Sequence, residues 1–482
     1  MPEVLEQLRK AVGETNVRVG EAVHADYTHD ETLRVSPVAP LALVLPGSTS
    51  EVSEVLKVAS EHGVPVVARG SGTGLSGAAV PVPDGILLAF DRMHRILELD
   101  VENQVAVVQP GVTLEQLNTA LAPLGLIYPV SPGEQSASLG GNVGTNAGGM
   151  RAVRYGVTRH HVLGLEVVLA DGTVMRTGGK FVKSSTGYDL TQLLIGSEGT
   201  LAVTTEVTVK VQPRMTETTT ILVPFATLPE VTHAVPRIVA SGVNPTILEY
   251  ADALVLGSIT RSAGLDLGIP ESIQQAALAY LIVVLEESSE GRLDEDVERL
   301  GLLLGELGAL DVYVLPPQAG AGLIEARERL FFVTKAAGAD DIIDAVIPRA
   351  AIPDYLARVA ELAAAHETFV SGCGHVGDGN VHLGMFQPDA EKRKALTREI
   401  FRLAVDAGGA VSGEHGLGTE KAPYFLELAD PAAVELMRSI KRAFDPGGIL
   451  GPHRMLGMDG PEPETEQEAD AAAVLAERGE SQ

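Results

Sequence analysis

Two histidines in the second half of the chain have the spacing expected for ligands of one metal ion. His375 and His382 flank the stretch 376–381, which reads VGDGNV. A hairpin loop over 377–380 would pair Val376 with Val381, and therefore His375 with His382. Directly opposed residues of two antiparallel strands have their Cβ atoms about 4.5–5.5 Å apart. Two imidazoles so placed can chelate one divalent ion, although a structural histidine pair is equally compatible with this spacing.

A third ligand is available about thirty residues later. The segment 412–418 reads SGEHGLG and places Glu414 beside a further histidine between glycines. Glu414 would complete a His2Glu set with an open coordination position, which is typical of a catalytic metal. Zinc is the preferred ion, and manganese or ferrous iron also accept this ligation. Asp378 is better suited to the hairpin turn than to metal binding.

A glycine-rich loop in the first half could bind phosphate. Residues 69–77 read RGSGTGLSG, which contains GxGxxG behind an apolar strand. A dinucleotide-binding crossover needs a dozen or more residues, mostly helical. Only eight residues separate Gly77 from the strand at Ile86, and two of them are Pro81 and Pro83. We therefore reject the NAD fold and interpret the loop as a run of free amides that holds an anion.

Two further segments are rich in glycine and other small residues. The first, 131–149, is almost free of charge, and the second covers 186–201. Small side chains make a poor core, but they allow backbone to approach a flat ligand closely. These segments are therefore predicted to form the walls of a cofactor site.

The elements that must position these residues fall into two regions. From 41 to 213, short strands alternate with helices, including a helix that begins after Ser48 and a hairpin around Asp171 and Gly172. After Pro213, β-rich segments such as 279–287 alternate with helical patterns. This order predicts a second α+β region whose sheet is largely antiparallel.

Composition limits the partners and the compartment. The chain has 482 residues and a formal net charge of −28, which repels nucleic acid and anionic membranes. A single cysteine, Cys373, excludes intrachain disulfides and cysteine-rich metal clusters. The longest apolar run, 276–285, is about half of what a membrane helix needs, and the N-terminus does not resemble a signal peptide. We expect a cytoplasmic protein without a membrane span.

Four motifs give the chain a specific resemblance. In order, RGSGTGLSGAAVP, GGNVGTNAGG, RYG and TGYDLTQLLIGSEGTLAVTTEVTVKV resemble the FAD-binding domain of vanillyl-alcohol-oxidase type flavoproteins. Within that group the chain is similar to the D-2-hydroxyacid dehydrogenases, which include D-lactate dehydrogenases and the FAD-linked subunit of glycolate oxidase. The resemblance extends to about Leu456. It implies an α+β fold with an FAD-binding domain at 1–214, a substrate or cap domain at 215–410, a C-terminal helical segment at 411–456 that completes the active site, and a disordered acidic tail at 457–482.

The resemblance also implies how FAD binds. The first glycine loop lacks histidine and Cys373 lies elsewhere, so the FAD is expected to be non-covalent. The loop would hold the pyrophosphate, and the later segments would pack around the flavin. The implied cofactor-binding residues are Arg69, Gly70, Ser71, Gly72, Thr73, Gly74, Leu75, Pro132, Gly133, Gly140, Gly141, Asn142, Thr145, Asn146, Gly148, Gly149, Tyr155, Gly156, Glu198, Gly199 and Val203.

The metal and catalytic residues are implied by two further family motifs. GHxGDGNxH and SxEHGxG match residue for residue, and they make His375, His382 and Glu414 the metal ligands and His415 the catalytic base. Arg327 stands where relatives carry an arginine that binds the substrate carboxylate. A solvated helix charge among neighbouring glutamates is the alternative for Arg327. Relatives usually carry asparagine where this chain has Gly451, a change that could alter flavin contacts, rate or substrate choice.

The implied reaction is oxidation of a small D-2-hydroxy acid, of the glycolate or D-lactate class, to the 2-oxo acid. Hydride would pass to flavin N5 while His415 takes the hydroxyl proton. Electrons would leave to a quinone or an acceptor protein, with an iron–sulfur subunit among the candidates, and a homodimer is compatible with the sequence. Two alternatives are a redox-neutral enzyme of the alkylglycerone-phosphate synthase type and a non-catalytic FAD subunit of an oxidase complex.

Overall fold

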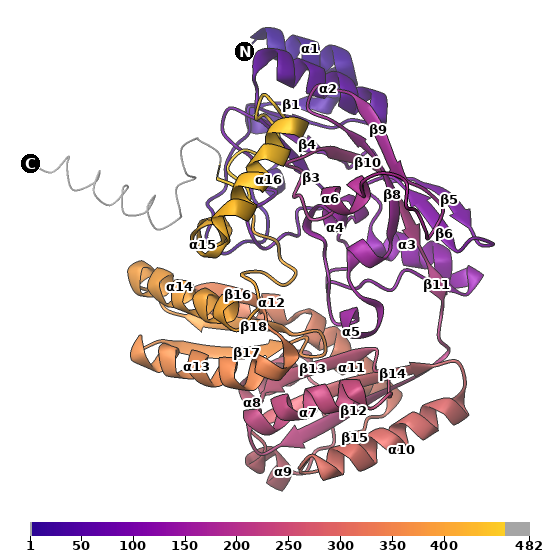
Figure 1. Ribbon diagram of the computed structural model, residues 1–482, viewed down its shortest axis with the longest axis vertical. Coiled ribbons are helices and arrows are strands. Elements are labelled where there is room, and N and C mark those ends of the chain that lie inside the picture. The colour runs from indigo at the N-terminus through magenta and orange to yellow at the C-terminus, as the bar shows by residue number, and fades with distance from the viewer. Residues whose placement is uncertain (1, 458–482) are drawn as a thin grey trace, which may run out of the picture.

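The computed structural model describes residues 2–457, which form two lobes that each contain α-helices and β-sheet (Figure 1). The acidic tail expected at 457–482 lies outside the described residues, apart from Gly457. In Figure 1 the N-terminal lobe is at the top and the second lobe is below it. Helix α15 (Ala422–Leu428) packs against α14 (Ala390–Asp406) of the second lobe, and α16 (Pro431–Phe444) returns to the side of the first lobe.

The first lobe begins with a four-stranded sheet in the order β1 (Val17–Arg18), β2 (Ala42–Val44), β4 (Ile86–Ala89) and β3 (Val66–Arg69). Strands β2, β4 and β3 are parallel, whereas β1 is antiparallel to β2. Helix α2 (Thr49–His62) connects β2 to β3 and packs beside α1 (Pro2–Val12). As predicted, Ser48 caps α2 by accepting from the amide of Glu51, and Gly63 ends it with φ of +63°.

A second sheet of the first lobe is antiparallel throughout. Its order is β5 (Ile96–Asp100), β6 (Val105–Val108), β10 (Val203–Lys210), β8 (Val162–Val168) and β9 (Val174–Gly178). The predicted hairpin joins β8 to β9. Shorter elements of this lobe are α3 (Leu114–Leu121), β7 (Leu126–Ile127), α4 (Leu139–Thr145), α5 (Ala152–Tyr155), α6 (Leu190–Leu194) and β11 (Gln212–Pro213).

The second lobe contains a seven-stranded sheet in which every recorded pairing is antiparallel, as the sequence predicted. The strands run in the order β15 (Tyr313–Val314), β12 (Glu217–Phe225), β14 (Ala279–Glu287), β13 (Ile247–Asp252), β17 (Phe369–Gly374), β18 (Asn380–Phe386) and β16 (Asp341–Val346). The helices of this lobe are α7 (Leu228–Ala240), α8 (Ala253–Ala263), α9 (Glu271–Ala276), α10 (Glu290–Glu306), α11 (Pro317–Glu328), α12 (Leu330–Ala336), α13 (Ile352–Ala365) and α14 (Ala390–Asp406).

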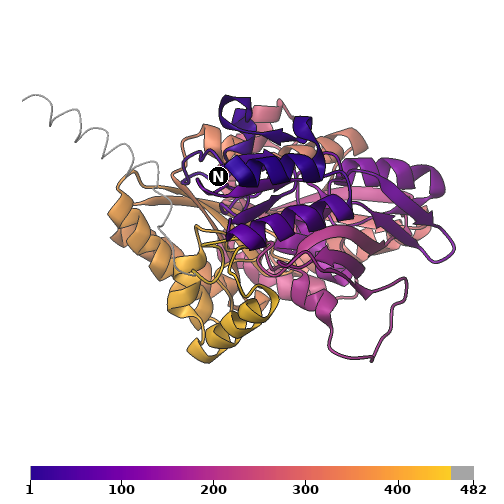
Figure 2. The ribbon, with the colours of Figure 1, turned by 90° about the horizontal axis from the view of Figure 1, so that it is seen from above.

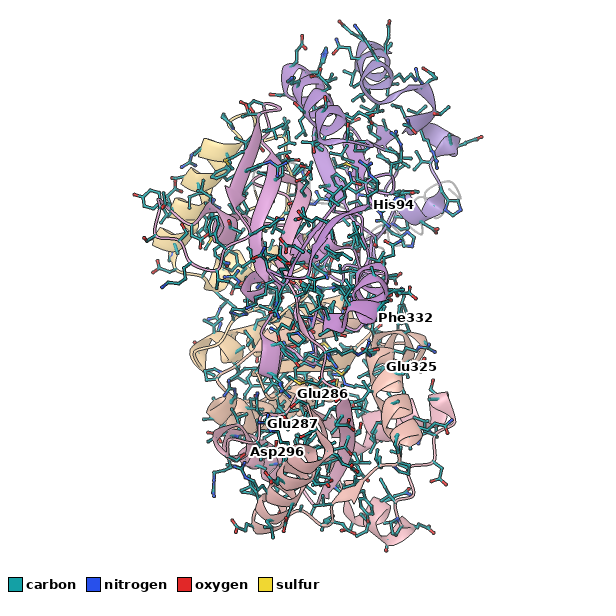
Figure 3. The ribbon with its side chains drawn as sticks, turned by 90° about the vertical axis from the view of Figure 1, so that its right-hand side faces the viewer. His94, Glu286, Glu287, Asp296, Glu325 and Phe332 are labelled. Carbon is teal, nitrogen blue, oxygen red and sulfur yellow. The ribbon has the colours of Figure 1, made fainter. Side chains whose placement is uncertain are left out.

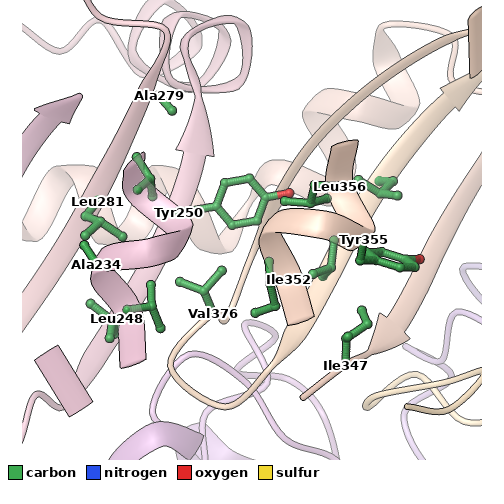
Figure 4. Close-up of a cluster of buried hydrophobic side chains, with 14 of the residues drawn as sticks. Ala234, Leu248, Tyr250, Ala279, Leu281, Ile347, Ile352, Tyr355, Leu356 and Val376 are labelled. Carbon is green, nitrogen blue, oxygen red and sulfur yellow. The ribbon is translucent and has the colours of Figure 1, made fainter. Parts of the chain in front are cut away.

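The two faces of this sheet have different partners. Alternate residues such as Leu248, Tyr250 and Leu281 pack with α7, α10, α13 and α14 in the largest apolar core (Figure 4). The residues between them, such as Ala251 and Ile282, pack with α8, α11 and α12. This two-residue period means that any polar residue placed between core positions projects from the second face.

The C-terminal segment completes the first lobe. Leu450 forms a parallel bridge with Val66, and the amide of Val66 donates to the carbonyl of Ile449 at 2.7 Å. Figure 2 shows this segment, in yellow, beside the N-terminal lobe. Gly451 donates its amide to the carbonyl of Val66 at 2.9 Å and has φ of +54°. Glycine and asparagine both tolerate this left-handed conformation, but a Cβ at this position would lie 2.9 Å from Cγ2 of Thr200, so asparagine would also require Thr200 to shift.

Among residues 2–457, no helix is long and apolar enough to cross a membrane. Cys373 is a buried free thiol on β17.

Candidate active site

The two histidines approach each other, but not through the predicted strand register. Cys373, rather than His375, pairs with His382, so His375 lies in the loop beyond the end of β17. The prediction was wrong because the loop is longer than four residues: the amides of Asp378, Gly379 and Asn380 all donate to the carbonyl of His375. The two imidazole centroids are nevertheless only 4.9 Å apart.

Glu414 contacts both histidines with one oxygen. Its Oε1 lies 3.0 Å from Nε2 of His375 and 3.2 Å from Nε2 of His382. Two ligands of a tetrahedral zinc ion at normal bond lengths are about 3.3 Å apart. Burial alone would raise the pKa of the Glu414 carboxyl, but the charges of the two histidines outweigh burial and hold this pKa well below its usual range. The donor atoms are therefore close enough, and chemically suited, to bind one divalent ion.

Glu249 orients His375, and sequence reasoning missed it. Its side chain projects from the second face of the sheet on β13, is fully buried, and places Oε1 2.5 Å from Nδ1 of His375. A carboxylate at Nδ1 keeps the proton on that nitrogen and leaves Nε2 free to bind a metal. Burial alone would raise the pKa of Glu249, but the neighbouring charges of His375 and Arg327 lower it. The available signal was an acid inside the apolar strand TILEYA.

Asp344 holds the loop that carries Glu414 and His415, and it was also missed. Its Oδ2 accepts the backbone amides of Gly413, Glu414 and His415 at 3.1, 3.2 and 3.0 Å. The hydroxyl of Ser412 donates to the same oxygen at 2.7 Å, and Nζ of Lys421 lies 3.3 Å away. This carboxylate fixes the backbone of the loop and so aims two functional side chains.

Asp344 also belongs to a second group of atoms close enough for a metal, together with His382 and His415. Its Oδ2 is occupied by the loop, and its Oδ1 accepts from Nδ2 of Asn380 at 2.7 Å. The group formed by His375, His382 and Glu414 therefore offers the more available donors.

His415 lies beside the ligand group without belonging to it. Its ring stacks on that of His382, with centroids 5.0 Å apart and an interplanar angle of 10°. Burial lowers the pKa of the His415 imidazole to about 4, and the Asp344 carboxylate opposes this shift only in part. The imidazole is therefore neutral near pH 7 and can accept a proton.

Arg327 is buried, with 6% of its surface exposed, so the alternative of a solvated helix charge is wrong. Its Nη2 lies 2.7 Å from Oε2 of Glu249. This contact is an ion pair without a directed hydrogen bond, because neither Nε nor Nη2 of Arg327 has a hydrogen-bond partner. The guanidinium faces a cavity with donors that are still available for an oxygen ligand.

A cavity of about 190 Å³ in the first lobe brings most of the predicted cofactor residues together. Those that line it are Arg69, Gly70, Ser71, Gly72, Thr73, Gly74, Leu75, Pro132, Gly140, Gly141, Asn142, Thr145, Gly148, Glu198, Gly199 and Val203. Phe90 and Pro110 also line the cavity and come from segments that carry no glycine motif, whereas Ser138 and Ser197 lie in the predicted glycine-rich segments 131–149 and 186–201.

Five predicted cofactor residues lie elsewhere. Gly133 and Gly149 line a neighbouring smaller cavity instead. Asn146 ends α4 in a left-handed conformation, and its side chain accepts the amide of Arg159. Tyr155 and Gly156 form the end of α5. Among residues 2–457, these last three line neither of the two cavities, and their predicted contact with the cofactor stays a prediction.

Glycine is required at the first cavity by close packing. A Cβ on Gly70 would lie 2.1 Å from Oγ of Ser138, and one on Gly140 would lie 2.5 Å from Cβ of Pro110. The Arg69 guanidinium lies against Gly72, where a Cβ would be 1.9 Å from its Nη2, and it donates to the carbonyls of His29 and Asp26 at 2.5 and 2.6 Å. Gly72 therefore leaves room for this side chain, whose donors are directed at backbone carbonyls.

The smaller cavity, of about 120 Å³, contains the metal-binding candidates and Arg327. It shares four lining residues with the larger one: Leu75, Pro132, Glu414 and His415. His415 therefore stands at the boundary between the place for a large flat ligand and the place for a small polar one.

Comparison with known proteins places the chain among flavoenzymes. Residues 40–178 match the model "FAD binding domain", and residues 214–455 match "FAD linked oxidases, C-terminal domain". An uncharacterized FAD-linked oxidoreductase of Mycobacterium tuberculosis is 54% identical, with 95% of this chain and all of that protein covered. The glycolate oxidase subunit GlcD of Bacillus subtilis is 36% identical over 95% of this chain and 97% of its own.

The D-lactate dehydrogenase of Archaeoglobus fulgidus is 38% identical over 89% of this chain and 95% of its own. Among solved structures, p-cresol methylhydroxylase with substrate bound superposes with a TM-score of 0.76 at 19% identity, over 94% of this chain and 96% of that one. At 19% identity, the similarity to p-cresol methylhydroxylase shows the fold alone, which is the vanillyl-alcohol-oxidase type expected from the sequence.

Proposed function

The chain belongs to the FAD-linked oxidases and is an FAD-dependent oxidoreductase, and from this premise we propose that it oxidises a small D-2-hydroxy acid, of the glycolate or D-lactate class, to the 2-oxo acid. The observation that carries the proposal is the position of His415 at the boundary of the two cavities, beside a set of metal ligands. The names of two relatives, a glycolate oxidase subunit and a D-lactate dehydrogenase, support this class of substrate.

FAD would occupy the larger cavity without a covalent bond, and when bound it supplies the hydride acceptor. The glycine-rich backbone of 69–75 and the amides near Gly140 line the space where phosphates would be held. Glu198 closes the wall by accepting the amides of Leu417 and Gly418 at 2.6 and 2.8 Å. This contact links the wall of the flavin cavity to the loop that carries the proposed base.

His375, His382 and Glu414 would hold a divalent metal, with zinc preferred over manganese or ferrous iron. When bound, the ion supplies a Lewis acid that lowers the pKa of a coordinated hydroxyl group. Glu249 fixes the tautomer of His375, and Asp344 fixes the backbone of Glu414, so the donor atoms are held in place before any ligand arrives.

His415 would take the hydroxyl proton of the substrate at Nε2, the nitrogen that lies 4.0 Å from Oε1 of Glu414. Arg327 would bind the carboxylate through its unpaired Nε and Nη2 groups. Base and carboxylate partner thus lie in one small cavity, which fixes the α-carbon of the substrate against the flavin cavity.

The electron acceptor would be a quinone or another protein, and an iron–sulfur subunit fits the absence of a cysteine cluster in this sequence. A redox-neutral enzyme and a non-catalytic subunit remain the competing functions. Neither needs the combination of a neutral buried imidazole, a His2Glu group and an arginine with free donors.

Anaerobic reduction of the purified flavoprotein tests the proposal. Glycolate or D-lactate should bleach the flavin stoichiometrically, whereas L-lactate should be far slower. The experiment is repeated after treatment with EDTA and dialysis. An unchanged rate would remove the metal from the mechanism, and a flavin that no 2-hydroxy acid reduces would favour the redox-neutral alternative.

A further inference from the structure

The smaller cavity has an apolar part that glycolate and lactate would not fill. Beyond the histidines and Arg327 its lining side chains come mainly from α8, α12 and β16 and are mostly apolar: Leu75, Met150, Val255, Leu330, Phe331 and Ile342. A cavity of about 150 Å³ lined by such residues can accommodate benzene. The volume of about 120 Å³ must also hold the hydroxyl and the carboxylate of the substrate, so it is the apolar wall that favours a side chain larger than methyl.

The same cavity offers no second cation. Among the described residues that line it, Arg327 is the only lysine or arginine. Its charge is already paired with Glu249, and its free donors suffice for one carboxylate. The hydroxyls of Thr334 and Ser371 also line the cavity, and Ser371 already donates to Asp252, so a second carboxylate would find no charged partner there, which is unfavourable.

Glu328 adds a negative charge to this wall. It is the last residue of α11, is partly buried, and lines the cavity on the side that faces a larger space of about 440 Å³ between the lobes. The only hydrogen bond to its carboxylate is from the hydroxyl of Ser131, at 3.4 Å, among the described residues. Burial raises the pKa of Glu328, so even one carboxylate is disfavoured here, and a second one close by would be more so.

Resting on the proposed oxidation, we propose that among D-2-hydroxy monocarboxylates this site prefers those with an apolar side chain larger than methyl, and that Glu328 disfavours acids with a second carboxylate. The hydroxyl and the first carboxylate would face His415 and Arg327. The side chain would then contact the wall formed by Leu330, Phe331 and Ile342. Glu328 thereby acts on specificity rather than on the chemical step.

A series of acids tests the apolar part of the cavity. The rate of anaerobic flavin reduction is measured with the holoenzyme for glycolate, D-lactate, D-2-hydroxybutanoate, D-2-hydroxy-4-methylpentanoate and D-2-hydroxyglutarate. One additional methylene in a fitting apolar pocket is worth about 10-fold or more. The second-order rate constant should rise by at least about 10-fold from glycolate to the branched acid, and D-2-hydroxyglutarate should be about 100-fold slower than the branched acid.

Two failures of this series have different meanings. If no 2-hydroxy acid reduces the flavin, the proposed function is wrong. If glycolate reduces it well while the rate falls with each added carbon, or if D-2-hydroxyglutarate matches the branched acid, oxidation stands and the inference about the side chain is overturned.

The variant Glu328→Gln tests the acidic wall. It should raise the ratio of the D-2-hydroxyglutarate rate to the branched-acid rate by about 10-fold, because one like charge is removed. Glu325→Gln is the matched control: it makes the same change one turn earlier on α11, where the side chain is exposed, does not line the cavity and is labelled in Figure 3. The control should leave the ratio unchanged.

A second variant keeps the inference testable if Glu328→Gln does not fold, which flavin content and melting temperature would show. Ile342→Lys places a cation in the apolar wall and should raise the same ratio at the expense of the branched acid. A ratio that moves in neither folded variant, or that moves equally in the Glu325→Gln control, overturns the role given to Glu328.

Discussion

The two cavities that meet at His415 are built in opposite ways. The larger one is made of backbone and small side chains, and its shape depends on glycines that have no room for a Cβ, such as Gly70 and Gly140. The smaller one depends on the chemical identity of buried side chains, among them His375, Glu249 and Asp344. The larger cavity is therefore sensitive to added volume, and the smaller cavity is sensitive to a change of a single functional atom.

Removing the proposed base should give the largest effect on activity, and the change should be confined to the smaller cavity. His415→Asn should lower the rate of flavin reduction by about 10²–10⁴-fold, because a general base is lost. Flavin content should stay near that of the wild type. Stopped-flow reduction and the flavin absorbance of the purified protein measure both, with the exposed His94→Asn (Figure 3) as the control. Loss of flavin in His415→Asn would show that the two regions are not separable.

Changing the acid that holds the loop should have the next largest effect. Asp344→Asn replaces an oxygen that accepts three backbone amides, so Glu414 and His415 lose their fixed positions. Activity and metal content should fall by about 10–100-fold, as for other residues that support metal ligands. Metal analysis and flavin reduction are the measurements. Ser412→Ala removes only one donor to the same oxygen and should have a much smaller effect; equal losses would contradict this account.

A single added methyl group tests the larger cavity, whose walls consist of backbone and small side chains. Gly140→Ala should destabilise the protein by about 1–3 kcal/mol and reduce FAD occupancy, because its Cβ would meet the ring and the carbonyl of Pro110. Metal content should not change. The control Gly301→Ala adds the same group to α10, where nothing lies within 4 Å, and should leave the melting temperature unchanged or slightly higher. Metal loss in Gly140→Ala would argue against two independent regions.

Asp30 is a buried acid beside the glycine loop of the larger cavity, and its substitution should have the smallest effect. Burial raises the pKa of Asp30 to about 6 from 3.8, so the folded protein binds its proton more tightly than the unfolded chain. Wild-type stability should therefore fall as the pH rises from about 4 to about 6, whereas Asp30→Asn should lack this contribution.

The amides of Thr32 and Ala79 donate to different oxygens of Asp30, and asparagine keeps an acceptor for only one of them, so the gain of Asp30→Asn at pH 7 should be at most on the order of 1 kcal/mol. Thermal denaturation of the apoprotein from pH 4 to 7 measures the difference. Parallel stability curves for the two proteins would show that Asp30 does not titrate in this range.

The same contrast explains what could be predicted from the sequence. The glycine loops and the proposed metal ligands His375, His382 and Glu414 lie in short continuous motifs, so their chemistry is visible in a window of a few residues. Glu249 is 126 residues from its partner His375, and Asp344 is 71 residues from His415. Only the fold brings these pairs together, so spacing could not indicate them.

The predicted pairing of His375 with His382 was wrong for a related reason. The prediction assumed a four-residue loop, whereas the carbonyl of His375 accepts three successive amides and lengthens the turn. Apolar alternation does match the face of the sheet in β18, where Val381, Leu383 and Met385 face the main core. Local geometry at the turn is set by the polar residues that occupy it, and the alternation carries no information about them.

The bridge between Val66 and Leu450 bears on how the protein is made. Strand β3 lies at the edge of the first sheet, and it pairs with residues near 450 on its open side only after they have left the ribosome. Glu198 likewise needs the amides of Leu417 and Gly418. A nascent chain that has completed the glycine loops therefore still lacks part of the wall of the proposed flavin cavity. Cofactor uptake should accordingly follow the end of translation, and C-terminal truncation before 450 should yield a protein without flavin even though every glycine motif is present.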